Sequence, residues 1–128
     1  RFHFPYSGQV SPSTKIKGHY VSVSPYALEA NFTSVFCGNK RTYLTLSTKE
    51  KGDILLSPVG ATMVGSIVDT YTPNTTVDKG DEMGYFAFGG STVVMLIDQN
   101  KVTIDEDILR NTKNKIETAV QMGERIGV

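Results

Sequence analysis

Cysteine and histidine, the residues that most often bind transition metals, are scarce in this chain of 128 residues. Cys37 is its one cysteine, so the chain can form neither an internal disulfide nor a cysteine-based zinc site. The two histidines, His3 and His19, lie far apart in the sequence and give little basis for a metal site. We therefore expect no bound metal, and we expect His19, next to Gly18, to be part of a turn or the surface.

An excess of charge of one sign and a long apolar run are also lacking. Basic residues number 13 and acidic residues 13, so the formal net charge is zero. A nucleic-acid-binding protein needs a basic face, and a segment attracted to anionic lipid needs a basic cluster, so both classes are disfavoured. The longest apolar run, residues 93–97, has the length of a strand, so we expect neither a signal peptide nor a membrane-spanning segment within these residues.

What is present centres on residues 79–97. An acidic turn between glycines opens this stretch, an aromatic strand leads to Gly89 and Gly90, and Ser91 and Thr92 begin a β-branched, apolar run. Elsewhere, short alternating segments between glycines and prolines favour strands. We expect a mainly β (α+β) fold, with antiparallel sheets in a barrel-like or sandwich-like arrangement and one short C-terminal helix.

The positions of the expected elements follow from these patterns. Strands are predicted over residues 15–23, 42–48, 54–59, 59–68 and 116–120, a polar hairpin turn over 49–53, and a proline-initiated turn, with at most a single helical turn, over 24–30. Asp105 is predicted to cap the short helix that follows it. The pattern Val-x-x-Gly-acid-x-apolar-Gly occurs over residues 77–84 and again over 120–127, which predicts two similar hairpin turns.

Gly90 and Ser91 form the chemical centre of the sequence. Glycines before a hydroxyl permit backbone angles that other residues avoid, and a strained peptide would open the Gly90 carbonyl to attack by Ser91. The second glycine of a serine-hydrolase elbow is missing, and no lysine precedes Ser91 as it would in a phosphate-binding loop. From these residues alone, we favour a bulged strand–turn–strand that Ser91 merely caps.

Three segments resemble the phosphatidylserine decarboxylase family. Residues 79–86 and 88–93 match its processing site, and Gly-Gly-Ser-Thr, in place of Leu-Gly-Ser-Thr, is similar to one branch of the family. Residues 1–8 match the motif Arg-Phe-His-x-Pro-x-x-Gly, and residues 59–67 match Val-Gly-Ala-x-x-Val-Gly-Ser-Ile. A family-like Asn-x-Arg also occurs at residues 39–41.

This resemblance implies an enzyme that cleaves itself. The chain would break between Gly90 and Ser91, and Ser91 would become a pyruvoyl group, the cofactor of the family. His3 would be the general base and later the proton donor, because imidazole gains and loses a proton near neutral pH. The ketone of the pyruvoyl group would bind the substrate amine and accept the electrons released with carbon dioxide, the role of pyridoxal phosphate elsewhere.

One expected part of the self-cleavage machinery lies outside the chain. The family's Asp, which orients the His, is well upstream of the His motif, and two residues precede His3 here. We therefore interpret residues 1–128 as one catalytic domain that is truncated at its N-terminus. We expect this piece alone to cleave itself slowly or not at all.

Three functions remain open at this point. The first is a carboxy-lyase that converts phosphatidylserine to phosphatidylethanolamine and carbon dioxide. The second is a pyruvoyl-dependent decarboxylase of a free amino acid, aromatic or otherwise, and the third is a non-catalytic β-sandwich binding module. The resemblance further implies a homodimer, membrane contact through upstream segments, and membrane association for the first function or a cytoplasmic location for the second.

Overall fold

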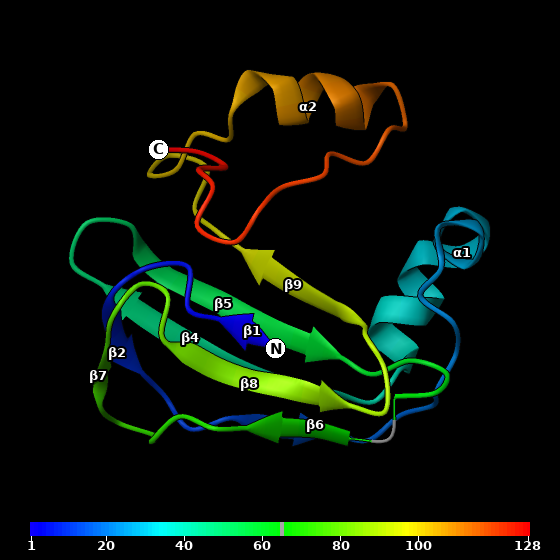
Figure 1. Cartoon of the computed structure of the whole chain (residues 1–128), viewed down its shortest axis with the longest axis horizontal. Coiled ribbons are helices and arrows are strands. Elements are labelled where there is room, and N and C mark those ends of the chain that lie inside the picture. Colours follow the sequence, from blue (N-terminus) through cyan, green and yellow to red (C-terminus); the bar gives the residue numbers. More distant parts are fainter. Residues whose placement is uncertain (65) are drawn as a thin grey trace.

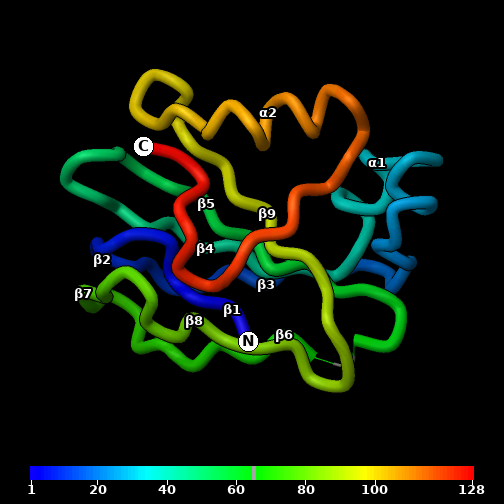
Figure 2. Tube along the Cα trace, turned by 45° about the horizontal axis from the view of Figure 1, so that its top comes forward, coloured from blue at the N-terminus to red at the C-terminus, as the bar shows by residue number. Residues whose placement is uncertain are grey.

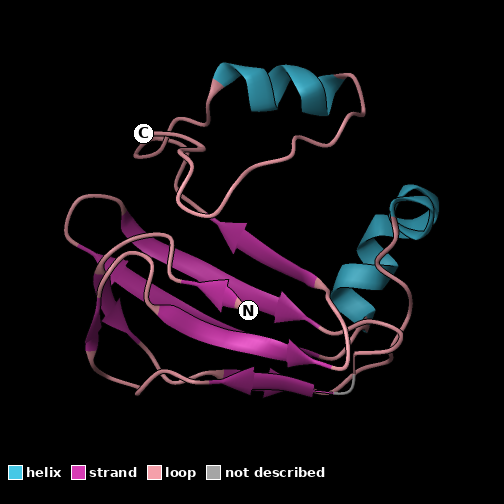
Figure 3. Cartoon of the chain, in the orientation of Figure 1, coloured by secondary structure: helices cyan, strands magenta, loops and turns pink. Residues whose placement is uncertain are grey.

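The computed structural model describes residues 1–64 and 66–128 (Figure 1). Strands make up most of its regular structure, and helices occur between β3 and β4 and after β9 (Figure 3). In chain order the elements are β1 (Phe2–His3), β2 (Gly8–Val10), β3 (Thr14–Ile16), α1 (Pro25–Gly38), β4 (Arg41–Thr48), β5 (Gly52–Val59), β6 (Ser66–Asp69), β7 (Thr76–Val77), β8 (Glu82–Ala87), β9 (Thr92–Leu96) and α2 (Glu106–Lys113). The predicted fold class, mainly β with a short C-terminal helix, is confirmed.

The strands form two antiparallel sheets that pack against each other. One sheet has the order β1-β8-β6, and the other has the order β7-β2-β4-β5-β9, with β3 paired to β4. The consecutive strands β8 and β9 therefore belong to different sheets. This arrangement matches the sandwich-like prediction, and it makes the connection between β8 and β9 a crossing from one sheet to the other.

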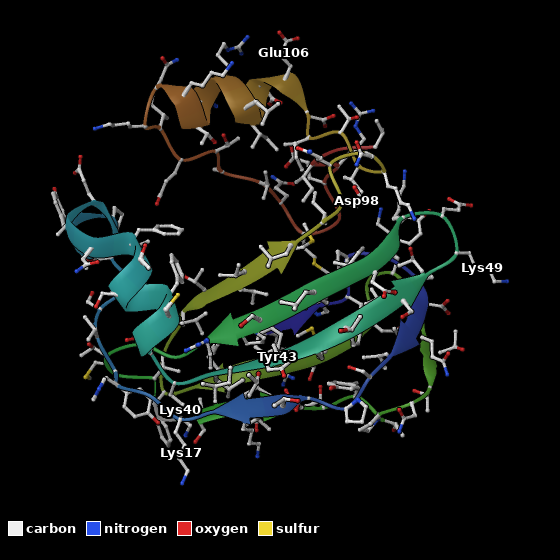
Figure 4. All side chains as sticks on the ribbon, turned by 180° about the vertical axis from the view of Figure 1, so that it is seen from behind. Lys17, Lys40, Tyr43, Lys49, Asp98 and Glu106 are labelled. Atoms are coloured by element: carbon white, nitrogen blue, oxygen red, sulfur yellow. The ribbon has the colours of Figure 1, made fainter. Side chains whose placement is uncertain are left out.

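The hydrophobic core lies between the sheets. Its buried side chains come from both of them and from the loop after β1: Phe2, Phe4, Val10, Leu44, Leu46, Ile54, Leu56, Val77 and Met83. Burial of such apolar surface is the main force that holds two sheets together. The labelled charged side chains of Lys17, Lys49 and Glu106 point outward from the fold (Figure 4).

The β4–β5 hairpin follows its sequence pattern closely. Leu44 and Leu46 are buried and Tyr43 and Thr45 face outward, as period-two alternation predicts. The predicted polar turn joins these strands, and Gly52 adopts a φ of +70° there. Pro58 does not interrupt the second strand, because β5 continues to Val59.

Helix α1 corrects the prediction of a short turn over residues 24–30. The Ser24 hydroxyl accepts a hydrogen bond from the Ala27 amide, and Pro25 occupies the first turn, both typical of a helix start. The helix has 14 residues and is kinked at Asn31, where φ is −160° and ψ is 70°. The predicted strand over 15–23 is also shorter, since β3 ends at Ile16.

Two further predicted strands are turns or irregular segments in the structure. Residues 60–64 form a turn between β5 and β6, in which the Val64 amide bonds the Ala61 carbonyl, so a continuous strand over 59–68 is wrong. Gly60 does permit a close approach, because a Cβ there would lie 2.9 Å from the Lys40 carbonyl oxygen. Gly65 lies outside the described residues. Residues 116–120 are irregular rather than a strand.

The repeated sequence pattern does form two matching turns. Asp78 and Gln121 each donate a backbone amide to the acidic side chain three residues later, Asp81 and Glu124, at 2.8 and 2.7 Å. The glycines inside the turns, Gly80 and Gly123, have φ values of +92° and +85°. The strands that follow and precede the first turn do not pair with each other, so it is not a hairpin.

Helix α2 stands apart from the sheets, and the chain after it doubles back (Figure 2). Val128 and Thr103 exchange two backbone hydrogen bonds of 2.7 and 2.9 Å, which fixes the returning segment. Asp105 precedes the helix as predicted, but its carboxylate binds Arg125 at 3.0 Å and makes no side-chain cap. Within the described residues, neither helix combines the length and apolar character needed to cross a bilayer.

Candidate active site

The candidate site is the loop of residues 88–91, which leads from β8 in one sheet to β9 in the other (Figure 1). The two strands are held by different partners, β8 by β1 and β6 and β9 by β5. No ladder hydrogen bonds cross this loop as they would in a hairpin. The bulged strand–turn–strand that the residues alone favoured is therefore replaced by a connection between two sheets.

Unusual backbone angles occur just before Gly90. Phe88 has a φ of +67°, a region that non-glycine residues rarely adopt, and Gly89 has a φ of +152°. The neighbouring turn contains a second such residue, Met63, with a φ of +71°. Its carbonyl oxygen would lie 3.4 Å from a Cβ placed on Gly89, so the two loops are in contact. Strain of this kind is typical of functional sites.

The bond between Gly90 and Ser91 joins an exposed residue to a half-buried one. Gly90 is exposed, and a Cβ placed on it would meet no atom within 4 Å. The Ser91 side chain is half-buried, and its hydroxyl donates a hydrogen bond of 2.5 Å to the Val59 carbonyl oxygen. This bond directs the Ser91 hydroxyl toward Val59 and leaves the neighbouring Gly90 exposed.

Large apolar side chains flank this bond. Phe88 is 86% exposed and Met63 is 81% exposed. The segments that meet here, residues 54–64 and 83–97, contain no charged residue. These two segments are therefore uncharged and partly apolar, and the nearest charged neighbours in the sheet are Lys40 and Arg41 beside Gly60 and Val59.

His3 lies away from Ser91 in this structure. It pairs with Glu82, the first residue of β8, whereas the loop with Ser91 follows Ala87 at the other end of that strand. A strand extends about 3.3 Å per residue, so the path from Glu82 to Ala87 covers roughly 16 Å. The structure thus brings Gly90 and Ser91 together but does not place His3 within hydrogen-bonding distance of Ser91.

The surroundings of His3 are dominated by the Glu82 carboxylate. Thr70 donates a hydrogen bond of 2.9 Å to one carboxylate oxygen, and Arg1 bonds the other at 2.6 Å. The Thr70 hydrogen bond is the main cause that lowers the pKa of Glu82, and Arg1 and the charge of His3 add to it, against partial desolvation. Arg1 also lies over the Tyr85 ring at 5.5 Å. These contacts hold the short strand β1 in its register on β8.

Sequence reasoning did not find the Val59 carbonyl or the exposed pair of Met63 and Phe88. The motif over residues 59–67 marked the segment, but a sequence pattern does not reveal which carbonyl faces Ser91. Two surface grooves lie elsewhere, one between α2 and the segment that includes Ile116 and Val120, and one beside the β4–β5 turn and Lys79.

Known proteins are similar to this chain over its whole length. The family model described as phosphatidylserine decarboxylase matches residues 1–128. A protein of Fusobacterium nucleatum subsp. nucleatum named phosphatidylserine decarboxylase proenzyme is 54% identical over 99% of this chain and 42% of its own length. A protein of the same name from Clostridium botulinum strain Hall is 52% identical over 100% of this chain and 43% of its own length. A relative of the same name in Desulfitobacterium hafniense strain DCB-2 is 51% identical, over 100% and 43%.

The chain thus spans less than half the length of these curated relatives. No solved structure matches it significantly. The family match extends over every residue, including the strained loop and the Gly90–Ser91 bond. The chain therefore belongs to the phosphatidylserine decarboxylase family.

Proposed function

We propose that this chain is the catalytic portion of a carboxy-lyase that converts phosphatidylserine to phosphatidylethanolamine and carbon dioxide, after self-cleavage between Gly90 and Ser91. The observation that carries the proposal is the Ser91 hydroxyl, held by the Val59 carbonyl next to an exposed Gly90. The relatives' printed names, which call them proenzymes of this activity, support it.

The bonds that change during self-cleavage all belong to Gly90 and Ser91. The Ser91 oxygen attacks the Gly90 carbonyl carbon, a C–O bond forms, and the Gly90–Ser91 C–N bond breaks as the nitrogen takes up a proton. In the resulting ester, a base removes the Cα proton of residue 91, and the Gly90 carboxylate leaves. Water then replaces the nitrogen, which departs as ammonia, and residue 91 is left with a ketone. A hydroxyl is needed because its oxygen is first the nucleophile and then part of the leaving group.

The two products of cleavage stay together in this fold. β8 remains in its sheet through β1 and β6, and β9 remains paired with β5 from Leu55↔Leu96 to Val59↔Thr92. Because β8 and β9 are not paired with each other, breaking the loop removes no strand pairing. The new first residue of the second piece is thus held in place by the Thr92 pairing.

The surroundings of position 91 fit a pyruvoyl group. The side chain is half-buried, which protects a reactive ketone, and the open space at Gly90 leaves room for a substrate amine. When present, this group would supply an electron-accepting ketone for loss of carbon dioxide. Exposed Phe88 and Met63 beside it favour a substrate with apolar chains over a free amino acid.

His3 is the proposed base and proton donor, although it lies opposite Glu82 in this structure. This role rests on the family to which the chain belongs, because the Arg1–Glu82 ion pair holds β1 opposite the far end of β8 from Ser91. Replacement of His3 by Gln should abolish cleavage, whereas His19→Gln, the matched control, should cleave normally.

We propose in addition that the full-length protein is a homodimer and contacts membranes through segments outside residues 1–128. Exposed apolar side chains such as Leu96 and Met122, 58% and 69% exposed, leave surface for further protein contacts. Light scattering after size-exclusion chromatography measures the dimer directly.

The function is tested with the full-length protein and its Ser91→Ala variant. We expect the unaltered protein to appear in mass spectra as two pieces separated before residue 91, the second with a blocked N-terminus. It should release carbon dioxide from phosphatidylserine vesicles, and Ser91→Ala should do neither. Release from free amino acids but not from vesicles would favour the second function, and full function of an uncleaved Ser91→Ala variant would support a binding module.

A further inference from the structure

The Val59 carbonyl that holds Ser91 belongs to the Val59–Gly60 peptide, and contacts on both sides of Gly60 hold that peptide in place. Ser91 Oγ donates to Val59 O at 2.5 Å. The following residue, Gly60, is fixed from both sides: its amide donates to the Lys40 carbonyl oxygen at 2.7 Å, and its carbonyl accepts from Asn39 Nδ2 at 2.8 Å. The position of the Val59 carbonyl thus depends on contacts made by residues 39–40.

Asn39 is the buried centre of these contacts. It has no exposed surface, and both the nitrogen and the oxygen of its side-chain amide make hydrogen bonds. Nδ2 donates to the Gly60 carbonyl and, at 2.7 Å, to the Val21 carbonyl, while Oδ1 accepts from the Val21 amide at 3.1 Å. Two donors and an acceptor on one short side chain are available only from an amide. The bonds join the segment before α1 to the turn that follows β5.

We propose that Asn39 is a positioning residue for self-cleavage: it fixes the Gly60 peptide so that the Val59 carbonyl can orient the Ser91 hydroxyl. This inference rests on the proposed function of Ser91. With its proton directed at Val59 O, the Ser91 oxygen keeps its lone pairs available for the Gly90 carbon. Without the Asn39 bond, Gly60 is held at its amide alone, so the Val59–Gly60 peptide can tilt, the hydroxyl samples other rotamers and the reactive geometry is populated less often.

A purely structural role for Asn39 makes a different prediction. In that case, replacing Asn39 would lower thermal stability, but cleavage well below the unfolding temperature would proceed at the normal rate. A positioning role predicts a slow first step in protein that is fully folded. The first step produces an ester, and hydroxylamine cleaves esters, so hydroxylamine treatment measures that step separately from the later elimination.

The test uses the full-length protein with Asn39→Asp and, as matched control, Ser57→Ala. Ser57 is also buried and donates a side-chain hydrogen bond, 2.8 Å to the Thr42 carbonyl, but it does not contact Gly60 or Ser91. We expect Asn39→Asp to form the hydroxylamine-sensitive ester about 100-fold more slowly, since small displacements of reacting groups can cost that factor. Ser57→Ala should form it at the normal rate.

The pH dependence gives a readout that a structural role would not produce. A buried Asp at position 39 loses the two donors, but its protonated form regains one of them and can bond the Gly60 carbonyl again. The ratio of the Asn39→Asp rate to the unaltered rate should therefore rise as the pH falls. Cleavage of folded Asn39→Asp at the normal rate, or a ratio that does not change with pH, would overturn the inference.

A second variant covers the case in which Asn39→Asp does not fold. Gly60→Ala leaves Asn39 intact but places a methyl group 2.9 Å from the Lys40 carbonyl oxygen, so the same peptide must move. It should also slow ester formation, and normal cleavage of Gly60→Ala would contradict the inference. Failure of the unaltered protein to cleave at all would instead refute the proposed function of Ser91.

Discussion

The two glycines before Ser91 are predicted to differ sharply in their tolerance of a side chain. Gly89 has a φ of +152°, and a Cβ there would contact the Met63 carbonyl oxygen at 3.4 Å. Gly90 has no positive φ and no atom within 4 Å of an added Cβ. The perturbation is therefore Gly89→Ala compared with Gly90→Ala, each in a Ser91→Ala background that prevents cleavage.

The size of the difference follows from the backbone angles. An alanine forced into a sparsely populated region costs about 1–3 kcal/mol, so we take about 2 kcal/mol of lost stability for Gly89→Ala. At Gly90, an alanine that fits reduces the entropy of the unfolded chain and adds about 0.5 kcal/mol of stability. The gap of about 2.5 kcal/mol corresponds to roughly 5–10 °C in Tm for a protein of a few hundred residues.

Scanning calorimetry of the two full-length variants measures this gap. Gly89→Ala should unfold at the lower temperature, and in the presence of Ser91 it should also cleave more slowly than Gly90→Ala. Equal Tm values for the two variants would show that the loop is not strained at Gly89, and the reasoning from its backbone angles would be refuted.

Two other predictions concern the rest of the fold. Replacement of Thr70 by Val removes a hydrogen bond to the Glu82 carboxylate and should raise the pKa of Glu82 toward its ordinary value in an NMR titration. A lowered carboxyl pKa stabilises the fold above the unfolded pKa, and this stability is lost as the pH falls through the folded pKa, so the variant should lose less stability on acidification. An unchanged Glu82 titration would contradict this prediction. Leu46→Ala, at a side chain with no exposed surface, should lower the free energy of unfolding by about 2–5 kcal/mol in denaturant titrations, whereas Tyr43→Ala, on the exposed face of the same strand, should change it by less than about 0.5 kcal/mol. Similar losses for Leu46→Ala and Tyr43→Ala would mean that the assigned core face of β4 is wrong.

The sequence predicted those elements whose signals are local. The alternation around Leu44 and Leu46 defined β4, and the repeated acidic turns were visible because each acid bonds a backbone amide three residues away. Asp105 marked the start of α2 correctly. Fold class also followed, since short alternating segments between turns have few other stable arrangements.

The sequence was less informative where tertiary contacts decide the structure. Helix α1 lacks a continuous apolar stripe and leaves Tyr26 and Phe32 exposed, so no helical period revealed it. The turn over residues 60–64 replaced a predicted strand because Gly60 packs against the Lys40 carbonyl and Met63 meets the loop of Gly89. For the site, the Gly90–Ser91 bond was found from its motif, but the position of His3 depends on the register of an edge strand, which sequence does not specify.

The pairing of β9 with β5 rather than β8 has a practical consequence. Residues 91–128 begin at the proposed break and enter their sheet as a separate strand, so they can be made by chemical synthesis and annealed to a recombinant first piece. Such a semisynthetic preparation would carry any chosen carbonyl compound or isotope label at its first position. It would allow catalysis to be studied without maturation.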